Sequence, residues 1–252
     1  MAPKGKSAKG NSAKSGGGGK AAAKRWRRTA LRWLRRLAIA LGVLIILPPA
    51  LTVLYRAEFT HPWSTLILRD MATLQHWERD WVEFEAIAPV LVQSVMVSED
   101  GQYCSHNGVD WTALNAVIDD ALDGEATRGA STITMQTAKN LFLWPSRSFL
   151  RKGIEIPLAL WIDLVLPKQR VMEIYLNIAE WGDGIYGVEA ASWTYFGRPA
   201  SELTARQAAL LAVTLPNPYL RDPVNPGPRV NRLANVIQGR AAQSGGYIGC
   251  LY

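Results

Sequence analysis

The chain has 252 residues, of which 48% are apolar, with 28 Lys and Arg against 21 Asp and Glu. This length fits one globular domain with an appendage and is too short for two enzymes in series. Twelve of the basic residues lie between Lys4 and Arg36, where no acidic residue occurs, so the remainder of the chain is net negative. A nucleic-acid-binding domain carries its positive charge on the folded face that meets phosphate, so this distribution argues against nucleic acid as a partner.

Residues 1–36 differ in composition from the sequence that follows. Residues 1–24 consist mainly of Lys, Gly, Ala and Ser, with no large apolar residue after Met1. Burial in such a segment cannot offset the entropy of ordering it, so we predict that residues 1–36 form a disordered basic tail.

Residues 37–55 form an uncharged apolar run. At about 1.5 Å of rise per residue, a helix of this length can cross a hydrocarbon core of about 30 Å. A dense cluster of basic residues flanks the run on its N-terminal side only, which predicts a cytoplasmic N-terminus and places residues 56–252 outside the cytoplasm. Pro48 and Pro49 interrupt the run and predict a kinked or loosened outer third.

Two alternatives exist for the apolar run. A buried core helix is disfavoured by the one-sided positive flank. A cleaved signal sequence is suggested weakly by Arg35 and Arg36, which resemble a twin-arginine signal, but no convincing small-x-small cleavage site follows. We therefore expect one uncleaved membrane helix, with anionic membrane lipids as partners of the basic tail.

Apolar spacing predicts helices over Ala88–Glu99, with Pro89 at its first position, and over Thr112–Asp123. Thr204 and Gln207 predict a capping box at the start of a further helix. Strand signals are poor throughout, so residues 56–252 are predicted to be mainly α.

Two further features lie towards the end of the sequence. The Pro-rich passage from Pro216 to Pro228 is expected to form an extended surface segment after the last core helix. Cys104 and Cys250 belong to no C-x-x-C pair, and we expect them to be unrelated free thiols.

Glu99 is the first candidate for chemistry. It lies on the apolar stripe of its predicted helix and near the helix C-terminus. Burial and the negative end of the helix dipole both raise the pKa of such a carboxyl group, which makes it a candidate for proton transfer. The alternative is a glutamate at a helix end that turns outward to water, and spacing alone does not separate the two.

The residues that follow Glu99 resemble the first motif of the peptidoglycan glycosyltransferases, the family that contains class A penicillin-binding proteins and monofunctional transglycosylases. The matching residues are Glu99, Asp100, Tyr103, His106, Gly108 and Asp110. Residues 129–140, 151–155 and 168–177 resemble further motifs of the family in the same order. The resemblance covers essentially all of residues 56–252, and its departures are Met135 in place of Gln and Tyr103 in place of Phe.

The resemblance implies a lysozyme-like helical fold and an enzyme of cell-wall biogenesis and cell shape. Such an enzyme polymerises lipid II into β-1,4-linked glycan strands by inverting transfer, with release of undecaprenyl diphosphate. The resemblance implies that Glu99 is the base and Glu155 a second essential carboxylate. The substrate-binding residues that it implies are Asp100, Ser131, Thr132, Gln136, Lys139, Asn140, Arg151 and Lys152.

Arg151 and Glu155 are four residues apart and so share a helix face. If these residues belong to the family motif, Glu155 could hold Arg151, or a bridging Mg²⁺ or Mn²⁺, at the leaving group. Without the motif, an ordinary surface ion pair would be the better interpretation of this spacing. We expect no tightly bound cofactor. His106 is expected to have a structural hydrogen-bonding role, and Glu173 and Asn177 to support the site.

The resemblance also implies lipid II and the growing lipid-linked glycan as substrates, and other cell-wall synthesis and division proteins as partners. The location that it implies is the bacterial inner membrane, with one membrane pass and a periplasmic catalytic domain. A lysozyme-like hydrolase or lytic transglycosylase and a non-catalytic scaffold are the alternatives. The cation-rich third motif and the membrane anchor favour synthesis. The sequence contains no Ser-x-x-Lys motif, which argues against transpeptidase activity.

Overall fold

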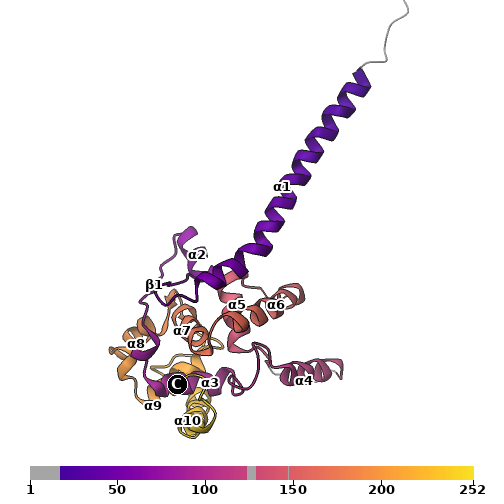
Figure 1. Ribbon diagram of the computed structural model, residues 1–252. Coiled ribbons are helices and arrows are strands. Elements are labelled where there is room, and N and C mark those ends of the chain that lie inside the picture. The colour runs from indigo at the N-terminus through magenta and orange to yellow at the C-terminus, as the bar shows by residue number, and fades with distance from the viewer. Residues whose placement is uncertain (1–17, 124–128, 147) are drawn as a thin grey trace, which may run out of the picture. The chain divides into compact units, whose positions relative to one another are not determined.

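The computed structural model describes residues 18–123, 129–146 and 148–252 (Figure 1). The chain divides into two compact units, residues 1–47 and 48–252. Helix α1 spans Gly18–Leu54, and its portion Arg25–Leu54 is long and apolar enough to cross a membrane. The predicted membrane helix therefore lies within a single helical segment.

Helix α1 is longer than the sequence led us to expect. It begins at Gly18, so residues 18–36, expected to belong to a disordered tail, are helical, and residues 1–17 lie outside the described residues. Ala, Lys, Arg and Leu dominate this stretch and have high helix propensity, so the helix continues through it from the apolar run. Helix α1 also runs through Pro48 and Pro49.

The second unit is mainly helical, as predicted. Its α-helices are α2 (Thr65–Ala72), α3 (Pro89–Glu99), α4 (Trp111–Leu122), α5 (Ile133–Phe142), α6 (Phe149–Val165), α7 (Lys168–Ile178), α8 (Val188–Phe196), α9 (Ala205–Thr214) and α10 (Pro228–Ala242). Short 3₁₀-helices lie at Phe84–Ala86, Ala200–Glu202 and Ser244–Gly246. A small sheet has the order β1-β3-β2, in which β3 (Ile185–Tyr186) is parallel to β1 (Glu78–Arg79) and antiparallel to β2 (Glu180–Gly182).

Helix α3 contributes one face to the core. It packs against α9 and α10, while α5 packs against α6 and α7 (Figure 1). The predicted stripe of Leu91, Val92, Val95 and Met96 is completely buried. Burial of this stripe fixes the helix along its length, so the position of Glu99 at its end is set by the core.

The sequence prediction located three helices well. Helices α3 and α4 begin and end within one residue of the predicted bounds, and the capping box of Thr204 and Gln207 is present at the start of α9. The expectation that the Pro-rich passage follows the last core helix is wrong. Helix α10 comes after it and buries Ala234, Ile237 and Ala241, small or isolated apolar residues that give a weak hydrophobic signal.

The expectation of two free thiols is also wrong. Cys104 and Cys250 form a disulfide across a sequence separation of 146 residues, with their Cα atoms 5.5 Å apart. The bond joins the loop after Glu99 to the segment after α10. Pairing over such a distance depends on the tertiary fold, which spacing in the sequence does not reveal.

We predict that the disulfide stabilises the second unit strongly. Closing a loop of this length restricts the unfolded chain, so the Cys104→Ser/Cys250→Ser variant should lose about 2–5 kcal/mol of unfolding free energy and about 5–20 °C in Tm. Thermal unfolding of the detergent-solubilised full chain measures the effect. Ser105→Ala, at an exposed neighbouring position, is the matched control, and an unchanged Tm in the Cys double variant would contradict the prediction.

Candidate active site

Glu99 is the last residue of α3; its side chain is half-buried, and Oε1 of its carboxylate is buried. Its Oε2 accepts a hydrogen bond from Nε2 of Gln136 on α5 at 2.9 Å. Burial raises the pKa of Glu99, although the Gln136 hydrogen bond and the charges of Arg221 and Lys139 act in the opposite direction. The predicted buried carboxyl group with a raised pKa is confirmed, and the alternative of a glutamate turned to water is not what the fold shows.

The neighbouring carboxylate, Asp100, serves the fold. Its Oδ2 accepts the backbone N–H of Ile133 at 3.0 Å, at the start of α5, and both its oxygens lie within 3.1 Å of Nε2 of His106. His106 has the structural hydrogen-bonding role expected of it. Asp100 therefore joins the end of α3 to the beginning of α5, and its predicted role in substrate binding stays a prediction.

Thr132 has a similar task at the start of α5. Its hydroxyl caps the helix by accepting the N–H of Met135 and donates to the carbonyl of Gly108 at 2.6 Å. Gly108 has φ +78°, and a Cβ at this position would lie 2.6 Å from the carbonyl oxygen of Ala159 on α6. Met135, where many relatives have Gln, is completely buried and belongs to the core.

Residues from the second and third motifs line one cavity of about 200 Å³, which we call the cation pocket. Its lining consists of Ser131, Gln136, Lys139, Arg151 and Glu155. Glu155 is buried and forms ion pairs with Arg151 and with Lys152, whose Nζ lies 3.3 Å from Oε2 of Glu155. Nζ of Lys152 also donates to Oγ of Ser131 at 2.6 Å.

The cation pocket carries more positive than negative charge. Glu155 is the one carboxylate among the described residues of its lining, whereas Lys139, Arg151 and Lys152 lie in it or beside it. Burial, followed by the charges of Arg151 and Lys139, lowers the pKa of Lys152 to about 8. Burial and Arg151 also lower the pKa of Lys139. Crowded cations of this kind favour binding of an anion, and lysine, arginine and hydroxyl donors together suit a phosphate or diphosphate group.

The donor set at Glu155 does not fit a resident divalent metal. Mg²⁺ requires several oxygen ligands, and within residues 18–123, 129–146 and 148–252 no group of three or more His, Cys, Asp or Glu side chains is arranged to hold a metal ion. Two cations already occupy Glu155. We therefore derive no step through a metal at this carboxylate.

Other candidate residues take different positions. Asn140 is buried, but neither it nor Thr132 or Asp100 lines the cation pocket. Arg221, which lowers the pKa of Glu99 from the segment between α9 and α10, was not among the sequence candidates. A single arginine in a Pro-rich passage does not indicate in the sequence that it acts on Glu99, because only the fold brings the two residues together.

Glu173 and Asn177 contribute to a different part of the unit. Asn177 accepts the N–H of Val82 at 2.9 Å and donates to its carbonyl at 2.8 Å, so it fixes the segment before α3 to α7. Glu173 pairs with Arg170 at 2.7 Å. These two residues therefore stabilise the fold around α7 and do not contact the candidate active-site residues in the hydrogen bonds and ion pairs that the structure describes.

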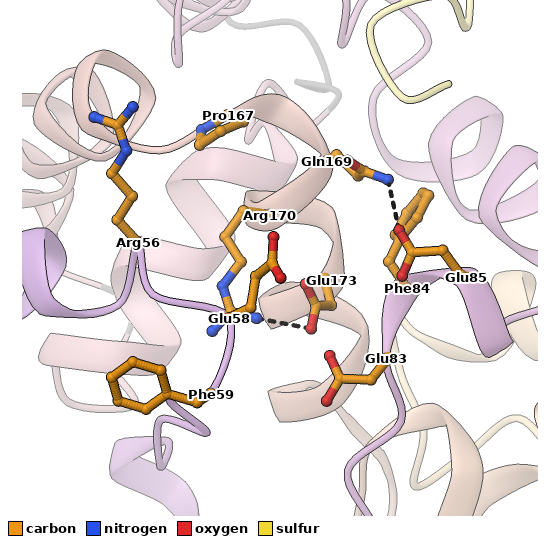
Figure 2. Close-up of a pocket in the computed structure, with 10 residues that line it drawn as sticks. All are labelled: Arg56, Glu58, Phe59, Glu83, Phe84, Glu85, Pro167, Gln169, Arg170 and Glu173. Carbon is orange, nitrogen blue, oxygen red and sulfur yellow. Dashed lines mark hydrogen bonds and ion pairs between the residues drawn. The ribbon is translucent and has the colours of Figure 1, made fainter.

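Figure 2 shows the cavity around this ion pair, which measures about 480 Å³. Arg170 also donates to the carbonyls of Tyr55 and Ala57, which lie just after the end of α1. Burial and the nearby Glu83 raise the pKa of Glu173 to about 7, against the effect of Arg170. Because the arginine is engaged with the chain itself, this cavity is a junction between α7 and the end of α1, and neither Glu99 nor Glu155 lines it.

Comparison with known proteins agrees with this geometry. Residues 67–242 match the family model described as transglycosylase. The chain belongs to this family. Proteins named biosynthetic peptidoglycan transglycosylase are 59% identical to it in Mesorhizobium japonicum, over 89% of this chain and 96% of the relative, and 60% identical in Brucella suis, over 87% and 99%. A relative of the same name in Rhizobium meliloti is 59% identical over 90% of this chain and 98% of its own length.

We predict a pH-dependent anion affinity in the cation pocket of this family member. Lys152 loses its charge as the pH rises through about 8, whereas arginine at this position would keep it. From pH 7 to 9.5, the affinity of the full chain for inorganic pyrophosphate should therefore fall about 3- to 10-fold relative to that of Lys152→Arg. Isothermal titration at several pH values measures the ratio of the two pyrophosphate affinities. Titration of Lys139 affects both proteins alike and so does not change this ratio. A ratio that stays constant would contradict the prediction.

Proposed function

We propose that this chain is a membrane-anchored peptidoglycan glycosyltransferase that polymerises lipid II into β-1,4-linked glycan strands for the cell wall. One observation carries the proposal: the carboxylate of Glu99 is hydrogen-bonded to Gln136, which also lines a pocket rich in cations. A base and an anion-binding pocket are thus adjacent. This pair is what transfer of a sugar from a diphosphate requires.

The reaction divides between these two groups. Glu99 takes the proton of the acceptor 4-hydroxyl as that oxygen forms a bond to the anomeric carbon of the donor. The bond from this carbon to the diphosphate oxygen breaks, and the electron pair leaves with undecaprenyl diphosphate. Lys139, Arg151 and Lys152 stabilise the charge that develops on the leaving group. Attack opposite to the departing group converts an α-linked donor into a β-linked product.

A hydrolytic reaction is the alternative that the same fold class allows. A hydrolase cleaves a glycosidic bond, so its leaving group is a sugar hydroxyl that needs a proton from an acid. The cation pocket would be of no use to such a leaving group. Three cations beside one carboxylate instead favour a reaction whose leaving group is an anion.

The proposed location is the inner membrane, with one pass and the catalytic unit in the periplasm. Helix α1 supports the single pass, and the basic residues on its N-terminal side support a cytoplasmic N-terminus. The Cys104–Cys250 disulfide adds independent support, because disulfides persist in oxidising compartments such as the periplasm. We also propose other cell-wall synthesis and division proteins as partners, since glycan strands must be incorporated into an existing wall.

The function is tested by polymerisation of lipid II in detergent, with products resolved by size. The wild-type chain should lengthen glycan. Glu99→Gln keeps the shape of the side chain and removes the base, so elongation should fall by about 10²-fold or more while lipid II binding survives. Glu155→Gln leaves the base in place but releases Arg151 and Lys152, so it should weaken binding of the diphosphate as well as turnover.

Asp119→Asn, at an exposed position on α4, is the control for the loss of one negative charge. Shortened glycan in place of lengthened glycan would identify a hydrolase. Elongation by Glu99→Gln at the wild-type rate would exclude Glu99 as the base.

The orientation is tested by proteolysis of spheroplasts. Protease added from outside should degrade residues 56–252 and leave an N-terminal fragment that contains α1. Full protection in intact spheroplasts, with digestion only after lysis, would place the catalytic unit in the cytoplasm. A periplasmic and a cytoplasmic protein of known location serve as controls in the same sample.

A further inference from the structure

Two consecutive hydrogen bonds hold Glu99 from across three helices. Nε2 of Gln136 on α5 donates to Oε2 of Glu99 at 2.9 Å, and the hydroxyl of Tyr175 on α7 donates to Oε1 of Gln136 at 3.2 Å. Tyr175 is 1% exposed and does not line the cation pocket. Its hydroxyl is connected by hydrogen bonds to Glu99 through Gln136.

The Tyr175 hydroxyl and the Glu99 carboxylate together set which way the Gln136 amide points. The two ends of a glutamine amide have nearly the same shape, so packing alone does not distinguish them. Burial, together with the charges of Glu99 and Asp100, raises the pKa of Tyr175 well above its usual value, so the hydroxyl keeps its proton. A hydroxyl that donates must face the carbonyl end of the amide, and the NH₂ end then faces Glu99.

This orientation gives the two oxygens of Glu99 different roles. Oε2 accepts the amide N–H, whereas Oε1 is buried and has no hydrogen-bond partner among the residues that the structure describes. The lone pairs of Oε1 are therefore unengaged within the described part of the chain, although the side chains that cover Oε1 must move before an acceptor hydroxyl can reach it. Donation by the amide stabilises the charged carboxylate, while a flipped amide would set its own oxygen against the carboxylate and favour protonated Glu99.

We propose that Tyr175 and Gln136 are positioning residues that leave Oε1 of Glu99 unengaged for the proton of the acceptor hydroxyl and keep Glu99 in its basic form. The kinetic part of this proposal rests on the proposed function, whereas the orientation of the Gln136 amide does not depend on any substrate. The resemblance implies that Gln136 binds substrate, and this proposal adds a second role, which is to orient the base Glu99. Tyr175 acts without touching substrate.

Other groups act on Glu99 from the elements around it. Lys139 on α5 and Arg221, between α9 and α10, lower the pKa of Glu99 by their charge. Burial acts in the opposite direction and is the larger effect. Tyr175→Phe leaves all of these groups in place and removes one hydroxyl, so it isolates the contribution of the proposed hydrogen bonds.

The first measurement needs no substrate. Infrared spectra of the full chain in detergent, taken as differences from Glu99→Gln, report the pH at which Glu99 titrates. Tyr175→Phe should raise this midpoint by about 0.5 to 1 pH unit, the effect of weakening one hydrogen bond to the charged form. Tyr103→Phe is the matched control, because its hydroxyl is equally buried but donates to the carbonyl of Lys168 at 2.8 Å.

The second measurement is the pH dependence of polymerisation. A higher midpoint for Glu99 moves the acidic limb of the kcat profile upward, so Tyr175→Phe should lose about 3- to 10-fold in kcat at low pH and recover at higher pH, with KM within about twofold. A loss of packing alone would lower kcat equally at every pH. In the Gln136→Met background, Tyr175→Phe should have no further effect on the profile, because the path to Glu99 is already broken.

The two measurements separate failure of this proposal from failure of the proposed function. An unchanged Glu99 midpoint in folded Tyr175→Phe would overturn the positioning role, even if the wild-type chain polymerises lipid II. A raised midpoint in a chain that does not polymerise lipid II would support the positioning and overturn the function. Should Tyr175→Phe fail to fold, Gln136→Met must raise the same midpoint, and its failure to do so would overturn the proposal.

Discussion

The contact on which the site depends most is the hydrogen bond from the N–H of Ile133 to the carboxylate of Asp100. It joins the residue after the end of α3 to the beginning of α5 at 3.0 Å. The first turn of a helix has unpaired N–H groups and a positive dipole end, so an acidic side chain is well suited to this position. Because Glu99 precedes Asp100 and Gln136 lies in the first turn of α5, this bond also brings the base and its amide partner together.

Two adjacent acidic residues thus have opposite environments. Asp100 accepts one N–H and pairs with His106, which satisfies its charge. Glu99 accepts only the Gln136 amide from a neighbouring helix, while burial opposes its charge. The carboxylate with few donors is the better base, and the one with several is the better tie between elements. The motif needs both residues for this reason.

Some of the site could be predicted from the sequence because its cause is local. The apolar stripe of α3 and its ending at Glu99 follow from helical periodicity, and the i,i+4 spacing of Arg151 and Glu155 anticipates their ion pair. The resemblance supplied candidate roles, but it did not separate residues that face the pocket from residues that hold it. Thr132 and Asp100 hold the pocket in place, since their side chains form hydrogen bonds with backbone groups of α5 and of the preceding loop.

Other features depend on contacts between distant parts of the chain. The charge of Arg221 acts on Glu99 from the Pro-rich passage, which the sequence predicts to lie at the surface. Helix α10 covers α3 with residues too small to produce a clear hydrophobic pattern. The Cys104–Cys250 bond and the Tyr175–Gln136 contact have the same origin. Each joins positions at least 39 residues apart, so helical spacing carries no information about them.

The disulfide also has a mechanical meaning. If one end of the unit is held in a membrane and tension is applied beyond Cys250, the load follows the chain only as far as Cys104 and then crosses the sulfur bridge. Helices α5, α6 and α7, which carry the cation pocket, lie within the bypassed loop. Helix α3 lies outside it, on the loaded path. Tension would therefore act directly on the segment that carries Glu99, whereas the helices that carry the cation pocket would not bear the load.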